Sequence, residues 1–256
     1  MTKPFFLVQL SDPHIGATWT NRDPAALWRA AIESVRALPD RTDAVLVTGD
    51  LVEHGADDEY AAVKSALDAI DVPTFVLPGN HDDRARLRQH FRLSGAHDEP
   101  VHYAVDLGPV RLIVLDSTTP GADSGELGER QLEWLEAELA TAPEQDTLLA
   151  MHHPPFLTGM APWDAIGVVP ADRAALGDVI RRHPQVRRIL AGHVHCRITG
   201  ELAGCIVLSA PSTYVQACPR YDIAELDLSD ESAAFAIHVV HGSEIVSFVE
   251  PVTIRG

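Results

Sequence analysis

Cysteine is scarce in this chain of 256 residues, which contains only Cys196, Cys205 and Cys218. An odd and small number of cysteines excludes a disulfide scaffold, so we expect reduced thiols in a cytoplasmic protein. Lysine is scarcer still: two lysines stand against eighteen arginines. That bias is typical of bacterial coding sequences rich in G and C, and it indicates origin without indicating function.

Long apolar runs are also lacking. The longest, such as Leu112 to Leu115, have the length of a strand and fall far short of the ~18 residues that a membrane span needs. The first apolar run, Phe5 to Leu10, is followed by Ser-Asp-Pro-His, whereas a signal peptide ends in small residues. We therefore expect a soluble protein with no signal peptide and no membrane partner.

Positive charge is in deficit, because 37 acidic residues outnumber 20 basic ones and give a formal net charge of −17. A surface of that sign repels nucleic-acid backbones and anionic lipid headgroups, so a nucleic-acid partner is disfavoured. With 46% hydrophobic and 22% charged residues, the chain is neither disordered nor of low complexity. Its length suits one α/β unit, and we predict a single domain over residues 1–256.

Short apolar runs alternate with segments of helical spacing, which predicts an α/β fold. The predicted strands are rich in Val, Ile, Leu or Phe, as in strands buried on both faces. They are Phe5–Leu10, Ala44–Val47, Thr74–Leu77, Arg111–Leu115, Thr147–Ala150 and Arg188–Leu190. The predicted helices are Pro24–Leu38, Asp57–Ile70 and Leu127–Ala140.

The pattern changes after Arg197 to strands and turn signals without a convincing helix. We expect hairpins that form a second sheet. The whole is then a sandwich with helices outside. The strands predicted in this part are Ile206–Leu208, Ile223–Leu228, Ala234–Val240 and Ile245–Phe248.

Polar residues follow five of the first six predicted strands directly. In open α/β sheets the carboxyl ends of neighbouring strands meet at one crevice, so side chains far apart in sequence would come together there. A single such Asp is usually a helix cap, but capping explains neither the shared placement nor the residue types, which are those of metal ligands. The segments are 11–14 (Ser-Asp-Pro-His), 48–50 (Thr-Gly-Asp), 78–82 (Pro-Gly-Asn-His-Asp), 151–153 (Met-His-His) and 191–195 (Ala-Gly-His-Val-His).

The series Asp-x-His, Gly-Asp, Gly-Asn-His-Asp, His and Gly-His-x-His resembles the motifs of the calcineurin-like metallophosphoesterases. The Asp-Pro-His start, the Met-His-His-Pro-Pro stretch at 151–155 and the Gly-His-Val-His ending are most similar to the bacterial class III cyclic-nucleotide and glycerophosphodiester phosphodiesterases. The resemblance runs from about Phe5 to Gln216. It implies a four-layer α/β/β/α sandwich of two mixed β-sheets flanked by helices.

The resemblance also implies a binuclear centre of divalent or trivalent ions, with Fe, Mn, Zn or Co suited to imidazole and carboxylate ligands. Two such ions would lower the pKa of a bound water towards 7, so that hydroxide attacks phosphorus. One carboxylate, that of Asp50, would bridge them. The implied ligands are Asp12, His14, Asp50 and His195 for the first ion and Asp50, Asn80, His152 and His193 for the second.

Further roles follow from the same resemblance. His81 would act as general acid or as donor to a phosphate oxygen, and Asp82 would orient it or support its loop. Asn80 and His81 would contact substrate, as would Thr213 and Tyr214. The latter two lie in the loop Ala210–Gln216, and the loop Ser117–Glu126 could also shape the pocket. We interpret His153 as structural support beside His152.

The predicted activity is the hydrolysis of small phosphodiesters, with 3′,5′-cyclic nucleotides of the cAMP type ahead of glycerophosphodiesters. A phosphomonoesterase could use the same metal site. A non-catalytic interaction module on this fold is a third hypothesis, although such a chain would be expected to have lost ligands. The family resemblance further suggests a homo-oligomer, a dimer or higher.

Overall fold

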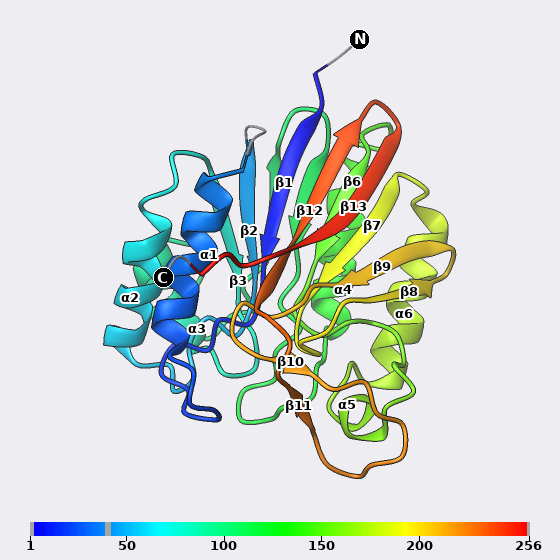
Figure 1. Ribbon diagram of the computed structural model, residues 1–256. Helices are drawn as coiled ribbons and strands as arrows, with labels where there is room; N and C mark the ends of the chain where they lie inside the picture. The colour runs from blue at the N-terminus through cyan, green and yellow to red at the C-terminus, as the bar shows by residue number, and fades with distance from the viewer. Residues whose placement is uncertain (1–2, 39–41, 255–256) are drawn as a thin grey trace.

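The computed structural model describes residues 3–38 and 42–254, which form two large β-sheets with helices on their outer faces and one small two-stranded sheet (Figure 1). The helices are α1 (Pro24–Arg36), α2 (Asp57–Leu67), α3 (Arg84–Phe91), α4 (Glu129–Ala140), α5 (Ala161–Ala165) and α6 (Pro170–Arg182). The strands are β1 (Phe5–Leu10), β2 (Ala44–Thr48), β3 (Thr74–Leu77), β4 (Tyr103–Asp106), β5 (Arg111–Val114), β6 (Thr147–Ala150), β7 (Val186–Ala191), β8 (Ile198–Leu202), β9 (Cys205–Ser209), β10 (Gln216–Ala217), β11 (Leu228–Ser229), β12 (Ala234–His241) and β13 (Glu244–Pro251).

Both large sheets are mixed. The five-stranded sheet has the order β13-β12-β1-β2-β3, with β1, β2 and β3 parallel and β12 antiparallel to β1. The six-stranded sheet has the order β4-β5-β6-β7-β9-β8, with a parallel centre and antiparallel edge strands. The predicted pair of mixed sheets is thereby confirmed.

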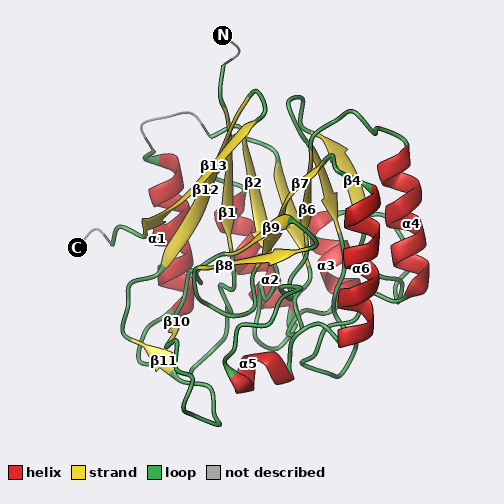
Figure 2. Ribbon diagram, turned by 90° about the vertical axis from the view of Figure 1, so that its right-hand side faces the viewer, coloured by secondary structure: helices red, strands yellow, loops and turns green. Residues whose placement is uncertain are grey.

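Three apolar clusters hold four layers together. Successive side chains of a strand point to opposite faces, so on β1 Leu7 packs between the two sheets while Val8 packs under the helices α1 and α2. The third cluster joins the outer face of the six-stranded sheet to α4 and α6, which stand side by side in Figure 2. The predicted α/β/β/α sandwich is confirmed.

Local sequence explains where the outer helices begin and which face they bury. Helix α1 starts with Pro24, whose missing N–H costs nothing at that position. Asp23 precedes it and accepts a hydrogen bond from the Ala25 backbone N–H. Within the helix, Trp28 and Ile32 lie four residues apart on the buried face, as an amphipathic helix requires.

The prediction that strands after Arg197 form a sheet of their own is wrong. Strands β8 and β9 extend the six-stranded sheet beside β7, whereas β12 and β13 join β1 in the five-stranded sheet. The apolar residues of β12 face both the helix layer and the sheet interface, so β12 completes the core of the N-terminal half.

The strand predicted at Ile223–Leu228 is also wrong, because only Leu228–Ser229 is extended there. Acidic residues interrupt that segment, and most of its residues are exposed, so it has no face to bury in a sheet. Among the described residues, no helix has the length and apolar character needed to cross a lipid bilayer.

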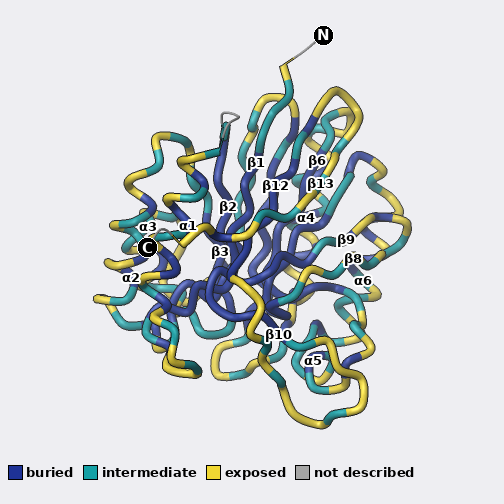
Figure 3. The backbone as a smooth tube through the Cα atoms, viewed as in Figure 1, coloured by how far each residue is buried: buried dark blue, intermediate teal, exposed yellow. Residues whose placement is uncertain are grey.

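The carboxyl ends of the parallel strands lie together at the lower ends of the two sheets in Figure 1, above β10, β11 and α5. The turns that follow β1, β2, β6 and β7 are buried like the strands themselves, and the dark tube of Figure 3 continues into them. Burial of such polar turns requires that their side chains find partners.

Candidate metal centre

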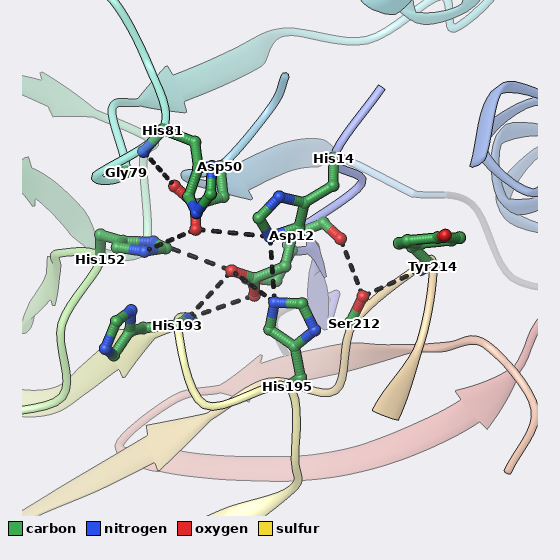
Figure 4. Close-up of polar contacts among 12 residues, drawn as sticks. Asp12, His14, Asp50, Gly79, His81, His152, His193, His195, Ser212 and Tyr214 are labelled. Carbon is green, nitrogen blue, oxygen red and sulfur yellow. Dashed lines mark hydrogen bonds and ion pairs between the residues drawn. The ribbon is translucent and has the colours of Figure 1, made fainter. Parts of the chain in front are cut away.

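Turns after strands of both sheets bring their polar side chains to one place. The seven predicted ligands are Asp12, His14, Asp50, Asn80, His152, His193 and His195, and the six that Figure 4 labels point towards a common centre. His14 Nε2 lies 3.1 Å from His195 Nε2 although 181 residues separate them. His152 Nε2 lies 3.1 Å from Asn80 Oδ1. The expected convergence of strand ends is therefore observed.

The backbone of this centre is strained. Asp12, His14, Asp50, His193 and His195 have positive φ angles of 51°, 43°, 48°, 70° and 46°, a region that costs a residue with a side chain of order 1–3 kcal/mol. Among the described residues, only two other non-glycine residues have a positive φ angle. Strain gathered in this way at one cluster is a sign of a functional site.

Two of the proposed ligands are each preceded by a glycine, which allows neighbouring turns of the centre to approach each other closely. A Cβ on Gly79 would overlap the carboxylate and the backbone nitrogen of Asp50, and one on Gly192 would overlap Ser11 Oγ and the Thr48 carbonyl. Only glycine leaves room for such contacts. The Gly-Asn and Gly-His pairs of the sequence thus have a steric cause.

Two histidines, His14 and His195, present an unprotonated Nε2 to the centre, and His152 would give up a proton to a metal ion. Burial lowers the pKa of His152, but the Asp50 and Asp12 carboxylates outweigh it and raise that pKa to about 9. His14 and His195 each have Nδ1 beside an oxygen that can only accept: Glu53 Oε2 at 3.0 Å from His14 and the Val215 carbonyl at 2.9 Å from His195. Such a partner places the proton on Nδ1 and leaves a lone pair on Nε2. The facing Nε2 atoms of His14 and His195 then have no proton to share, which is the arrangement that a cation requires.

His193 supplies another free nitrogen. Its Nε2 is buried and has no hydrogen-bond partner, although buried polar atoms are nearly always satisfied. Its backbone N–H is occupied, since it donates to both carboxylate oxygens of Asp12 at 3.1 and 3.2 Å. One ring nitrogen of His193 lies within 4.8 Å of ring nitrogens of His152 and His153, so this imidazole fits a metal ligand.

Asp50 lies between the two halves of the centre. Its Oδ2 is 3.4 Å from His14 Nε2 and 3.3 Å from His152 Nε2, while its Oδ1 accepts the His81 backbone N–H at 2.9 Å. Asp12 Oδ1 is 3.6 Å from His195 Nε2. Nitrogen and carboxylate donors without a thiolate suit Fe, Mn, Zn or Co in an open site, and the donor set fits two such ions.

Burial and neighbouring charges set the protonation of the cluster. Burial raises the pKa of Asp50, but His152 and His14 outweigh it and hold that pKa well below its ordinary value. Burial lowers the pKa of His195 to about 4 and that of His193 well below its ordinary value. At neutral pH these groups are a carboxylate and two neutral imidazoles, which are the forms that bind metal.

His81 and Asp82 have different surroundings. The side chain of His81 is 30% exposed and lines the cavity beside the centre. The carboxylate near it is that of Glu53, 3.5 Å from its Nδ1. Asp82 accepts hydrogen bonds from the Leu51 and Gly79 backbone and from the Tyr60 hydroxyl instead. Of the two roles expected of Asp82, this geometry favours support of the loop.

Thr213 and Tyr214 do not reach the cavity, contrary to the expectation that they contact substrate. Both are buried, at 1% and 0% exposure. The Thr213 hydroxyl donates to the Ser11 carbonyl, and the Tyr214 hydroxyl accepts the Thr20 N–H. The turn after β9 packs against the turn after β1, so these side chains fill the space between the two turns.

His153 supports the site from behind. Its Nδ1 lies 2.9 Å from Ser117 Oγ and its Nε2 lies 3.0 Å from the Asp123 carbonyl, so both ring nitrogens are engaged. This agrees with the interpretation of His153 as structural. It also anchors the loop Ser117–Glu126, from which Asp123 reaches the cavity.

A cavity of about 340 Å³ opens beside the centre, within the range of small-molecule sites. Its polar side consists of the ligand candidates with His81 and Asp123. Sequence reasoning missed its apolar side and also missed Glu53, which contacts both His14 and His81. The only signal was a tryptophan five residues after His14. The apolar side is formed by Trp19, Trp163, Ile166, Leu226 and Leu228.

Comparisons with known proteins agree with this geometry. The family model described as calcineurin-like phosphoesterase matches residues 7–197. The chain is 39% identical over 217 residues to a "Probable cyclic nucleotide phosphodiesterase" of Rhodococcus erythropolis, which covers 81% of this chain and 70% of the relative. It is 32% identical over 234 residues to a "Probable glycerophosphodiester phosphodiesterase GpdQ" of Arcobacter nitrofigilis, covering 89% and 83%.

Among solved structures, a dimetal phosphatase from Danio rerio superposes with a TM-score of 0.75 at 19% identity and covers 97% of this chain and 96% of that one. At this identity the likeness establishes the fold alone.

Proposed function

The chain belongs to the calcineurin-like phosphoesterases, and we propose that it is a binuclear metal-dependent phosphodiesterase whose first substrates are 3′,5′-cyclic nucleotides of the cAMP type. One observation carries the proposal: unprotonated imidazole nitrogens and two carboxylates face one another at the wall of a cavity. The name of the Rhodococcus relative supports the cyclic-nucleotide class.

The residues divide into two ligand sets around the Asp50 carboxylate. When bound, two such ions supply Lewis acidity to a phosphoryl group and make water more acidic. No cysteine takes part. The first set is Asp12, His14, Asp50 and His195, and the second is Asp50, Asn80, His152 and His193.

His81 is proposed to donate a proton to the leaving oxygen. Its ring lies in the cavity wall next to Asn80, and the nearby Glu53 and Asp50 carboxylates raise its pKa despite the opposing effect of burial, the largest single influence. A histidine whose pKa is raised above its ordinary value is suited to general acid catalysis. Asn80 and His81 are then the residues that would contact the phosphate.

A diester suits the cavity better than a monoester. Within the described part of the chain, no lysine or arginine lines this cavity, and Asp123 adds a negative charge to its wall. A monoester dianion would find no cationic side chain other than histidine there. A diester carries one charge less and a second substituent, which the apolar side of the cavity can receive.

The test is a comparison of rates with Mn²⁺-loaded protein on bis-p-nitrophenyl phosphate, p-nitrophenyl phosphate, cAMP and glycerophosphoethanolamine. We expect diester rates above monoester rates and cAMP ahead of the glycerol diester. Faster hydrolysis of glycerophosphoethanolamine would favour the activity named for the Arcobacter relative. No hydrolysis together with no bound metal would leave the non-catalytic module.

The remaining expectations are part of the same proposal. We propose a small bacterial hydrolase that forms a single domain over residues 1–256. It would reside in the cytoplasm and assemble as a homo-oligomer. Sedimentation analysis of the full chain tests the oligomer, since a species with the mass of one 27.8 kDa chain would contradict it.

A further inference from the structure

Trp19 is an unusual member of the cavity wall. It is 40% exposed, whereas an indole of this size is highly buried in most proteins. It is nevertheless held in place: Nε1 donates to Glu53 Oε1 at 3.0 Å, and its ring centre lies 4.4 Å from that of His14 and 5.8 Å from that of Tyr214. An ordered indole that remains partly exposed beside the proposed metal ligands calls for a partner.

A second tryptophan faces the same space. Trp163 lies with its ring centre 5.6 Å from that of His193 and 6.1 Å from that of His195, while the ring centre of Trp19 lies 5.9 Å from that of His195. Both indoles therefore lie next to one proposed ligand. Both are in the cavity wall, so a group bound to the metal side would have aromatic surface next to it.

The rest of the apolar wall consists of Ile166 at the end of α5 and two leucines from the segment between β10 and the start of β11. Leu226 is 50% exposed and Leu228 is 37% exposed, and both line the cavity. Large apolar side chains gathered in an exposed hollow mark a binding site rather than a random surface. Among the residues that the structure describes, no lysine or arginine lines the cavity to bind a second phosphate, and its apolar side offers little polarity to a glycerol group.

We infer that Trp19 is the residue that selects the substrate, by stacking on the nucleobase of a cyclic nucleotide whose phosphate lies on the metal side. The inference rests on the proposed function. A nucleobase is planar, uncharged and largely apolar on its faces, which matches a cavity lined by an exposed indole and two exposed leucines. Stacking of this kind tolerates any base, since every base has an aromatic face.

The experiment measures binding of two products that share a phosphate and differ in the rest. Affinities of 5′-AMP and glycerol 3-phosphate are measured by calorimetry on the Mn²⁺-loaded protein for the wild type, Trp19→Ala and Trp19→Phe. We expect Trp19→Ala to lose about 10-fold to 100-fold in affinity for 5′-AMP, the usual effect of removing one base-stacking ring. Glycerol 3-phosphate should bind as before, and Trp19→Phe should retain most of the affinity for 5′-AMP.

Kinetics on substrates complete the design. In Trp19→Ala the kcat/KM for cAMP should fall mainly through KM, with a much smaller change for glycerophosphoethanolamine. Phe248→Ala is the matched control, because Phe248 is also 40% exposed but lies on β13 outside the cavity, and it should change neither affinity.

Three results would overturn the inference. Equal losses for 5′-AMP and glycerol 3-phosphate would mean that Trp19 only positions His14 and Glu53. A larger loss for glycerophosphocholine than for cAMP would identify a cationic headgroup as the partner of the indole. An unchanged affinity for 5′-AMP would exclude stacking. Failure of the proposed function differs from all three, since the wild type would then hydrolyse no diester.

Discussion

Asn80 offers a sharp test at the scale of single residues, because the chain has only one other asparagine, Asn21. Asn80 Oδ1 lies next to His152 Nε2, so Asn80→Ala removes a proposed ligand of the second ion without touching Asp12, His14 or His195. We expect metal content to fall from two ions to about one per chain and turnover to fall at least ~10²-fold. Elemental analysis and rates on bis-p-nitrophenyl phosphate measure both.

Asn21→Ala is the control for that variant, since Asn21 is exposed and lies outside the cavity. It should keep two ions and full activity. If Asn80→Ala also kept two ions and full turnover, the second ligand set would be assigned wrongly.

His81 should behave differently from Asn80. It lines the cavity but belongs to neither ligand set, so we expect His81→Ala to retain both metals and to lose ~10²-fold or more in rate, the usual contribution of a general acid. A substrate with a good leaving group, such as bis-p-nitrophenyl phosphate, needs less protonation than cAMP. The loss should therefore be larger on cAMP, and equal losses on both substrates would argue against proton donation.

Sequence alone could predict which side chains gather at the centre, because each is a chemically distinctive residue at the end of an apolar run. Their division into two ligand sets follows from the family resemblance and stays a prediction. It could not identify Glu53 or Trp19. The carboxylate of Glu53 gains its meaning from contacts with His14 and His81, and the indole of Trp19 from the cavity that it lines. Such contacts form between elements, and no local pattern records them.

At the scale of elements, the geometry of the centre depends on the close approach of the turn after β3 to the turn after β2. Gly79→Ala would push a methyl group into Asp50, and overpacking of this kind costs about 1–3 kcal/mol of the free energy of unfolding. It should also displace Asp50 and weaken metal binding. Urea denaturation in chelator gives the first effect, and metal titration gives the second.

Gly177 in α6 provides the matched substitution, because the nearest atom to an added Cβ is Leu202 Cδ1 at 3.5 Å, an ordinary contact. Gly177→Ala should be neutral or stabilise the protein by up to about 1 kcal/mol, since alanine favours a helix over glycine. Equal destabilisation by both substitutions would show that the close approach at Gly79 is not the cause.

The bounds of a strand can be predicted from its own sequence, whereas its pairing in a sheet cannot. β1, β3 and β6 have the predicted bounds, because each is a short run rich in apolar residues with a proline or a polar residue at one or both ends. The pairing of β12 with β1 depends on which surface β12 covers, and that surface is made by α1, β1 and β2 together. Periodicity in β12 could therefore predict a strand and not its sheet.

At the scale of the whole molecule, stability in acid should depend on His238, which joins three strands of the five-stranded sheet. His238 is 1% exposed. Its Nε2 lies 2.9 Å from Gln9 Oε1 on β1 and its Nδ1 lies 2.8 Å from Ser247 Oγ on β13. Burial, with a smaller effect of Arg188, lowers the pKa of His238 to about 4.

The unfolded chain has an ordinary histidine pKa of about 6.5, so it binds a proton before the folded protein does as pH falls. The stability that neutral His238 contributes is complete above pH 6.5 and is lost between pH 6.5 and about 4. The difference between the two pKa values corresponds to about 3 kcal/mol of the free energy of unfolding. His238→Gln can keep both hydrogen bonds and cannot titrate, so its free energy of unfolding should fall less steeply over this range.

Urea denaturation at pH 7.5, 5.5 and 4.5, in chelator throughout, measures the difference between wild type and variant, so that metal loss and the other buried histidines cancel. His241→Gln at the exposed end of the same strand should follow the wild-type slope. If His238→Gln loses stability with the same slope as the wild type, the imidazole is not neutral in the fold. The hydrogen bonds of His238 to Gln9 and Ser247 would then contribute nothing to the pH dependence of stability. The pairing of β12 with β1 would be stabilised at every pH by apolar packing alone.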